Sequence, residues 1–202
     1  MFSDDDQEAV VRFVFSKDEN VELALRVIAA GEAIRERIIK EFLAKLEDEL
    51  WRRAKELGES WKVVNDLGKD PFKRWAQVYI TKQEWGGLYA VFLEPEKPGP
   101  SDFVLGVWGL GKKRPKDLDE GPVREALQQR FGRGMTNDGC PFYMWADPYR
   151  DWGDEATLCS FLGDRGSQAA RALSDTMLTI ARATEGIIDS VVQDWSKRQQ
   201  KG

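Results

Sequence analysis

Two long stretches of this chain repeat apolar residues every three or four positions, and this periodicity constrains the fold more than any other feature. From 21 to 57 the apolar side chains gather on one face of a helix, while Glu, Lys and Arg fill the other. Residues 167–198 show the same pattern. Gly31 costs about 1 kcal/mol relative to alanine inside a helix, which leaves open a break into two helices. The apolar positions of the first stretch are Leu25, Ile28, Ile38, Phe42, Leu46, Leu50 and Leu57.

Between these stretches the pattern changes to short runs of β-branched and aromatic residues. The runs 75–80, 88–93 and 103–108 are separated by segments rich in Gly, Pro and Glu, which is typical of an antiparallel meander. Residues 10–15 form a further β-like segment, and Ser16 with Glu19 has the spacing of a helix start.

The remaining segments complete an α+β pattern. A helix is predicted over 122–131, with Pro122 in its first turn and Gly132 as its stop, whereas 132–166 is irregular. We therefore predict an antiparallel sheet of three to five strands, packed against long amphipathic N-terminal and C-terminal helices. We expect one α+β domain over 1–202, with 1–9 as a flexible acidic tail.

Composition supports a folded chain and an expected location. The 202 residues are 42% hydrophobic and 32% charged, and no linker separates two self-sufficient regions. The net charge of −5 reflects near balance between acidic and basic residues. The first residues are acidic, unlike a signal peptide, and no apolar run is long enough for a membrane span. Cys140 and Cys159 are expected to be reduced core residues, so we expect a cytoplasmic protein.

The chain lacks the residues that several types of catalysis require. The chain contains no histidine, which excludes Ser-His-Asp and Cys-His hydrolysis and histidine-bound zinc unless a partner supplies the ring. The segment 106–113 has the spacing of a phosphate-binding loop, but Lys113 stands where Ser or Thr would hold magnesium. Glu94 and Glu96 come at a strand end and are expected to have no catalytic role. We therefore expect no catalytic residue, no metal site, no cofactor and no enzymatic activity.

A basic turn at 112–114 and an aromatic segment at 142–152 are the candidate binding surfaces. The turn suits a phosphate or an acidic protein face, although a solvated surface explains it equally well. The aromatic rings either pack against the protein's own sheet, which is the simpler interpretation, or contact a partner. Arg150 lies between Asp147 and Asp151, which predicts local salt bridges. Because Arg, Tyr and Trp carry most interface energy, the expected binding residues are Lys112, Lys113, Arg114, Tyr149, Arg150 and Trp152.

The segment 142–152, preceded by strands and the helix at Pro122 and followed by an amphipathic helix, resembles the carboxyl-terminal region of some PD-(D/E)XK superfamily nucleases of bacteria and phages. Such nucleases need an Asp and an acidic-x-Lys tripeptide to hold metal and position water. No lysine of this chain has Asp or Glu two positions before it. The resemblance therefore implies an accessory or recognition region, and no catalytic residue is carried over.

These observations favour a non-enzymatic interaction module that binds a macromolecular partner, with protein favoured over nucleic acid and with no membrane. In its finer form, the hypothesis is a phage or mobile-element inhibitor of a bacterial defence or nucleic-acid-processing complex. One alternative is a nucleic-acid-binding accessory domain of nuclease type, whose affinity should fall steeply with salt. A second is a metal-dependent hydrolase with a carboxylate-only site, which needs three converging acidic side chains.

Overall fold

The computed structural model describes residues 4–69, 73, 76–109 and 119–199. Within this part, helices and strands follow one another as an α+β fold, in agreement with the prediction. The α-helices are α1 (Asp4–Val14), α2 (Asp18–Ala29), α3 (Gly31–Ala54), α4 (Gly121–Phe131), α5 (Glu155–Ser160) and α6 (Gly163–Gln199), and a short 3₁₀ helix, η1, spans Gln83–Trp85.

The strands form one antiparallel sheet in the order β1-β2-β3-β4-β6-β5. The predicted meander is confirmed as β2, β3 and β4, and the sheet has six strands where three to five were expected. The strands are β1 (Trp61–Asn65), β2 (Val78–Lys82), β3 (Tyr89–Pro95), β4 (Phe103–Gly109), β5 (Met135–Asn137) and β6 (Cys140–Trp145).

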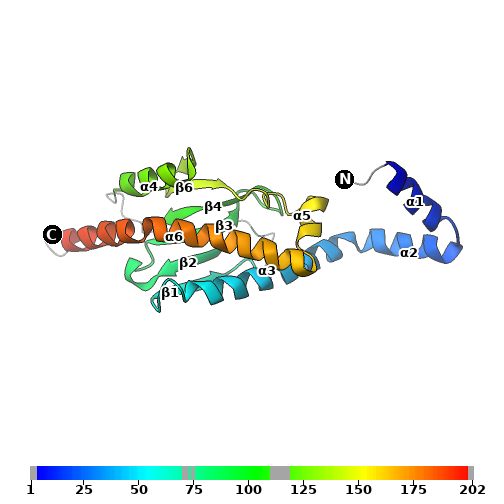
Figure 1. Ribbon diagram of the computed structural model, residues 1–202, viewed down its shortest axis with the longest axis horizontal. Helices are drawn as coiled ribbons and strands as arrows, with labels where there is room; N and C mark the ends of the chain where they lie inside the picture. Colours follow the sequence, from blue (N-terminus) through cyan, green and yellow to red (C-terminus); the bar gives the residue numbers. More distant parts are fainter. Residues whose placement is uncertain (1–3, 70–72, 74–75, 110–118, 200–202) are drawn as a thin grey trace.

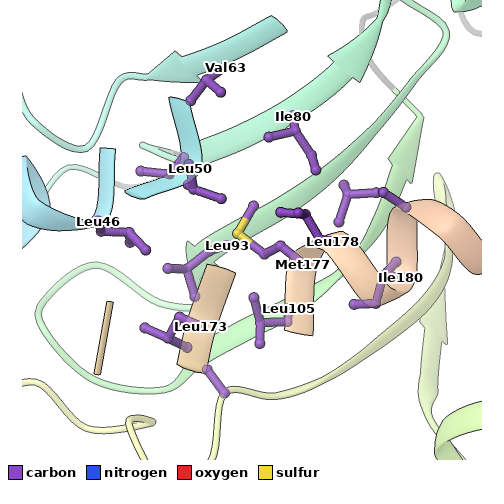
Figure 2. Close-up of a cluster of buried hydrophobic side chains, with 14 of the residues drawn as sticks. Leu46, Leu50, Val63, Ile80, Leu93, Leu105, Leu173, Met177, Leu178 and Ile180 are labelled. Atoms are coloured by element: carbon purple, nitrogen blue, oxygen red, sulfur yellow. The ribbon is translucent and has the colours of Figure 1, made fainter. Parts of the chain in front are cut away.

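The two faces of the sheet have different neighbours because side chains alternate along each strand. The inner face packs against α3 and α6, whose buried residues recur at helical spacing, and the result is one continuous core (Figures 1 and 2). Figure 2 shows Leu46 and Leu50 of α3 and Met177 of α6 meeting side chains of the strands. The outer face carries a smaller cluster whose members come from strands: Phe92, Val104 and Cys140, with Tyr79, Trp108, Met135, Tyr143 and Trp145 packed against them.

The helices that pack on the sheet agree with the sequence prediction. The break expected at Gly31 occurs at Ala30, between α2 and α3. The helix at Pro122 is α4, which ends at Gly132 with a φ of 80°. The C-terminal helix is α6, which begins four residues earlier than expected and ends one residue later.

Two predictions about the N-terminal residues are wrong: the strand at 10–15 and the helix cap at Ser16. Residues 10–15 are not a strand, because Asp4–Val14 is the helix α1, which also contains most of the expected flexible tail. α2 begins at Asp18 without a side-chain cap, and the Ser16 hydroxyl instead donates to the carbonyl of Phe13 over 2.7 Å. No described strand is available to pair with 10–15, so its β-branched and aromatic residues remain helical.

The segment 132–166 is more regular than predicted. It contributes β5, β6 and α5, and the prediction missed these together with β1. Within it Cys140 is buried, as expected, whereas Cys159 on α5 is exposed, so the expectation that both are core residues is wrong for Cys159. The two cysteines form no disulfide with each other.

α1 and α2 project beyond the end of the body that α3, α6 and the sheet form (Figure 1). We call residues 4–29 the arm. Leu25 and Ile28, predicted to face the core, are exposed on it, because the helix has run past the sheet that would cover them. In the described residues, no helix combines the length and the apolar character that crossing a bilayer requires.

Candidate functional site

The structure describes three of the six binding residues predicted from sequence. Lys112, Lys113 and Arg114 lie outside the described residues. Trp152 is fully buried, because its ring stacks on Phe103 at 3.7 Å and its indole N–H donates to the carbonyl of Tyr149. The expectation that Trp152 belongs to a binding surface is therefore wrong. Tyr149 is half-buried and packs against the same core.

Arg150 is held by a partner that sequence spacing did not indicate. Its Nε and Nη2 donate to Oδ1 of Asp102 over 2.9 and 2.5 Å, in place of the expected pairs with Asp147 and Asp151. Its guanidinium carbon lies 3.5 Å from the ring centroid of Trp145. The hydrogen bond from Arg150, with a further one from Lys97, lowers the pKa of Asp102. Arg150 therefore fixes the loop after β6 to the start of β4.

Among the described residues, the arm carries the largest set of large apolar side chains exposed to solvent. No side chain of α2, a helix described in full, is buried. Elsewhere in the described ranges, only Ile34, Trp51 and Leu162 are large apolar residues of comparable exposure. The exposed fractions reach 74% at Phe15 and 75% at Ile28. The exposed large apolar residues of the arm are Val10, Val11, Phe13, Phe15, Leu23, Leu25, Val27 and Ile28.

These side chains lie on helices that are locally well formed. Asn20 donates to the carbonyl of Phe13 over 3.0 Å and to the hydroxyl of Ser16 over 3.1 Å, which fastens the turn between α1 and α2. Arg26 pairs with Glu22 one turn earlier, on the polar side of α2. Leu23 and Val27 are four positions apart, and Leu25 and Ile28 are three apart, so the members of each pair lie side by side on the helix surface. The arm thus presents an ordered amphipathic helix whose apolar side faces solvent.

Charge distinguishes the arm further. Residues 4–29 contain seven acidic and three basic residues, so the arm carries most of the net negative charge of the chain. At the base of the arm, a groove of about 450 Å³ is lined by Glu32, Arg35 and Glu36 of α3 together with the loop at Gly99 and Pro100. Two glutamates and one arginine of α3 therefore border this groove beside the arm.

A second charged cluster has all its partners inside the protein. Nζ of Lys82 lies 2.6 Å from a carboxylate oxygen of Asp189 and 3.0 Å from one of Glu185, and the indole N–H of Trp85 donates to Asp189 over 2.8 Å. Burial lowers the pKa of Lys82, but these hydrogen bonds outweigh burial and raise it. This cluster ties η1 to α6. In the described part of the chain, no three cysteine or acidic side chains converge into a metal site.

The arm was not predicted from the sequence as a binding surface. Periodicity marks α2 as amphipathic, but the same pattern describes a helix that packs on its own sheet and a helix that packs on a partner. Comparison with protein-family models, curated proteins and solved structures finds no match for this chain. The resemblance to nucleases is neither supported nor refuted and stays a prediction.

Proposed function

We propose that this chain is a non-enzymatic interaction module that docks through its arm onto a partner protein with an apolar groove bordered by basic residues. The exposed apolar face of α2 supports the proposal most directly. An amphipathic helix laid into an apolar groove is a recurrent mode of recognition, with anchors at helical spacing. Leu23 and Val27 have that spacing, and so do Leu25 and Ile28.

The charge of the arm favours protein over nucleic acid. Phosphate groups attract basic surfaces, whereas the arm has an excess of four acidic residues over basic ones. The same charge disfavours pairing of two arms, because like charges would then face one another. A basic border on the partner would match the arm and speed association. The finer hypothesis of an inhibitor of a bacterial defence or nucleic-acid-processing complex stays a prediction.

The test is a triple substitution on the arm, Leu23→Gln, Val27→Gln and Ile28→Gln. Glutamine keeps the helix propensity high and removes the apolar anchors. We expect a partner captured by the unaltered protein, and then purified, to bind the triple variant at least about 100-fold more weakly, since buried anchors contribute about 1 kcal/mol or more each. Titration calorimetry with the purified partner measures this loss.

The matched control makes the same kind of change on the body, with Trp51→Gln and Leu162→Gln, which replace exposed apolar residues outside the arm. This control should keep the affinity of the unaltered protein. Equal weakening by both variants would contradict docking through the arm. Sedimentation velocity that shows self-association, lost in the triple variant, would replace the partner protein with a second copy of the chain.

A further inference from the structure

The outer face of the sheet contains a small pocket between its strands. The pocket has a volume of about 180 Å³, and its walls include Phe92 and Glu94 of β3, Trp108 of β4 and Tyr143 of β6. Gly106 lets β4 and β6 approach closely beside the pocket, because a Cβ at Gly106 would clash with the carbonyl oxygen of Phe142 and lie 2.7 Å from Cβ of Tyr143. At roughly 30 Å³ per water molecule, this volume equals about six waters, enough for a short aliphatic chain. We call this space the outer-face pocket.

Glu94 is the unusual group in this pocket. Alternation along β3 places it on the outer face, opposite Val104 of β4, and only 5% of its surface is exposed. Among the described residues, its carboxylate has neither a hydrogen bond nor an ion pair. Burial raises the pKa of Glu94 to about 7. Ionisation of a buried carboxylate that has no partner costs free energy. A cation that enters the pocket offsets this cost, because the ionised carboxylate of Glu94 then has a counter-charge.

The other walls favour an organic cation over a metal ion or a phosphate. Phe92 and Trp108 meet edge to face with centroids 6.1 Å apart, and the faces of aromatic rings attract ammonium groups. Calcium takes roughly six to eight oxygen ligands, more than two carboxylates and the amide of Asn137 supply. Among the described residues, no three acidic or cysteine side chains converge on a metal position. Glu96, which also lines the pocket, adds a second negative charge that disfavours phosphate.

We propose that the outer-face pocket binds an aliphatic ammonium ion, with Glu94 and Glu96 as its counter-charge and with Phe92, Trp108 and Tyr143 as ring walls. The ammonium group belongs either to a lysine side chain of a polypeptide or to a free small amine. The pocket is independent of the arm, because none of its walls belongs to residues 4–29. Failure of one proposal therefore leaves the other standing.

The experiment is a titration of the isotope-labelled full chain with n-butylammonium chloride, followed by NMR. We expect saturable shifts centred on β3, β4 and β6, and no saturable shift with 1-butanol, a neutral molecule of the same length. Glu94→Gln should weaken binding at least about tenfold, since a charge-assisted contact is worth about 1.5 kcal/mol or more. Glu59→Gln, an exposed change outside the pocket, should leave the affinity unaltered.

The pH dependence supplies a readout that needs no variant. The ammonium ion pairs with the ionised carboxylate, so the affinity of the unaltered protein should rise about tenfold between about pH 6 and about pH 8, as Glu94 loses its proton. In Glu94→Gln the affinity should stay flat over this range. No saturable binding of n-butylammonium, equal binding of 1-butanol, or equal affinity in Glu94→Gln would overturn the proposal.

A second titration separates the two sources of the ammonium group, using Nα-acetyl-lysine methylamide as the probe. Binding at least about tenfold tighter than that of n-butylammonium would assign the pocket to lysine side chains of a polypeptide, because the added backbone contacts then contribute. Equal affinities would assign it to free amines. Both results support recognition of an ammonium group.

Discussion

At the scale of single residues, burial gives two similar carboxylates different properties. Glu94 and Glu96 are two positions apart on the same strand end, and the sequence offers no reason to separate them. Glu94 lies within β3 and is buried by its neighbours on adjacent strands, whereas Glu96 follows the strand and is half-buried. The difference depends on which strands lie beside β3, which is a property of the tertiary structure.

The raised pKa of Glu94 predicts how the stability of the protein depends on pH. Its pKa is about 7 in the folded chain, against an ordinary value of 4.5, so the folded state holds this proton more tightly than the unfolded state. The contribution of Glu94 to the free energy of unfolding is therefore complete below about pH 4.5 and is lost as the pH rises through 7. The loss amounts to about 3 kcal/mol.

Urea unfolding at several pH values measures this effect. In Glu94→Gln the part of the pH dependence that belongs to this carboxyl should disappear, while Glu59→Gln should keep the profile of the unaltered protein. A Glu94→Gln variant with the same loss of stability between about pH 5 and about pH 8 would show that Glu94 ionises normally in the folded chain.

At the scale of elements, α2 and α3 have similar sequence patterns and different surroundings. α3 buries Ile39, Phe42, Leu43, Leu46, Leu50 and Ala54 against α6 and the sheet. No side chain of α2, which is described throughout, is buried. α2 therefore adds little to the stability of the body, because burial of apolar surface is the main stabilising contribution to folding.

Removal of residues 1–29 tests this difference. We expect the shortened chain to unfold cooperatively, with a melting temperature within about 2 °C of that of the full chain, because the deletion leaves the core intact. Thermal unfolding followed by circular dichroism measures the midpoint. A fall of about 10 °C or more would show that the arm is part of the folded core.

Local patterns explain which elements could be predicted from the sequence. α3, α4, α6 and strands β2 to β4 have strong periodicity or clear turn residues nearby, and each was predicted. β1, β5 and β6 were missed, because pairing with distant strands determines their structure. Residues 10–15 have strand-forming side chains, yet 10–14 are helical and Phe15 lies in the turn that follows, since no described strand pairs with them.

The candidate site was harder to predict than the fold. Aromatic density over 142–152 indicated an interface, but Trp152 completes a ring cluster with Phe103, Phe42 and Phe161 in the core. The sequence shows that aromatic rings need cover and cannot show whether that cover comes from the chain or from a partner. For α2 the same ambiguity led to the opposite error, since Leu25 and Ile28 were expected to be covered and are exposed.

At the scale of the whole molecule, the body and the arm have different physical characters. The body closes its core with α3 and α6 on one face of the sheet. The arm extends away from the body and carries both exposed apolar side chains and a net negative charge (Figure 1). Exposed apolar side chains gathered on an ordered helix favour association over an isolated existence in water. The central claim is that this face of α2 contacts another protein.

Site-specific photo-cross-linking in the cell that makes the protein tests this claim most directly. A photo-reactive phenylalanine analogue replaces either Val27, on the apolar face of α2, or Glu22, on its polar face. We expect position 27 to cross-link to one specific protein and position 22 to give little or no such product. Equal products from both positions, cross-links from position 27 to nucleic acid, or no product from position 27 would contradict it.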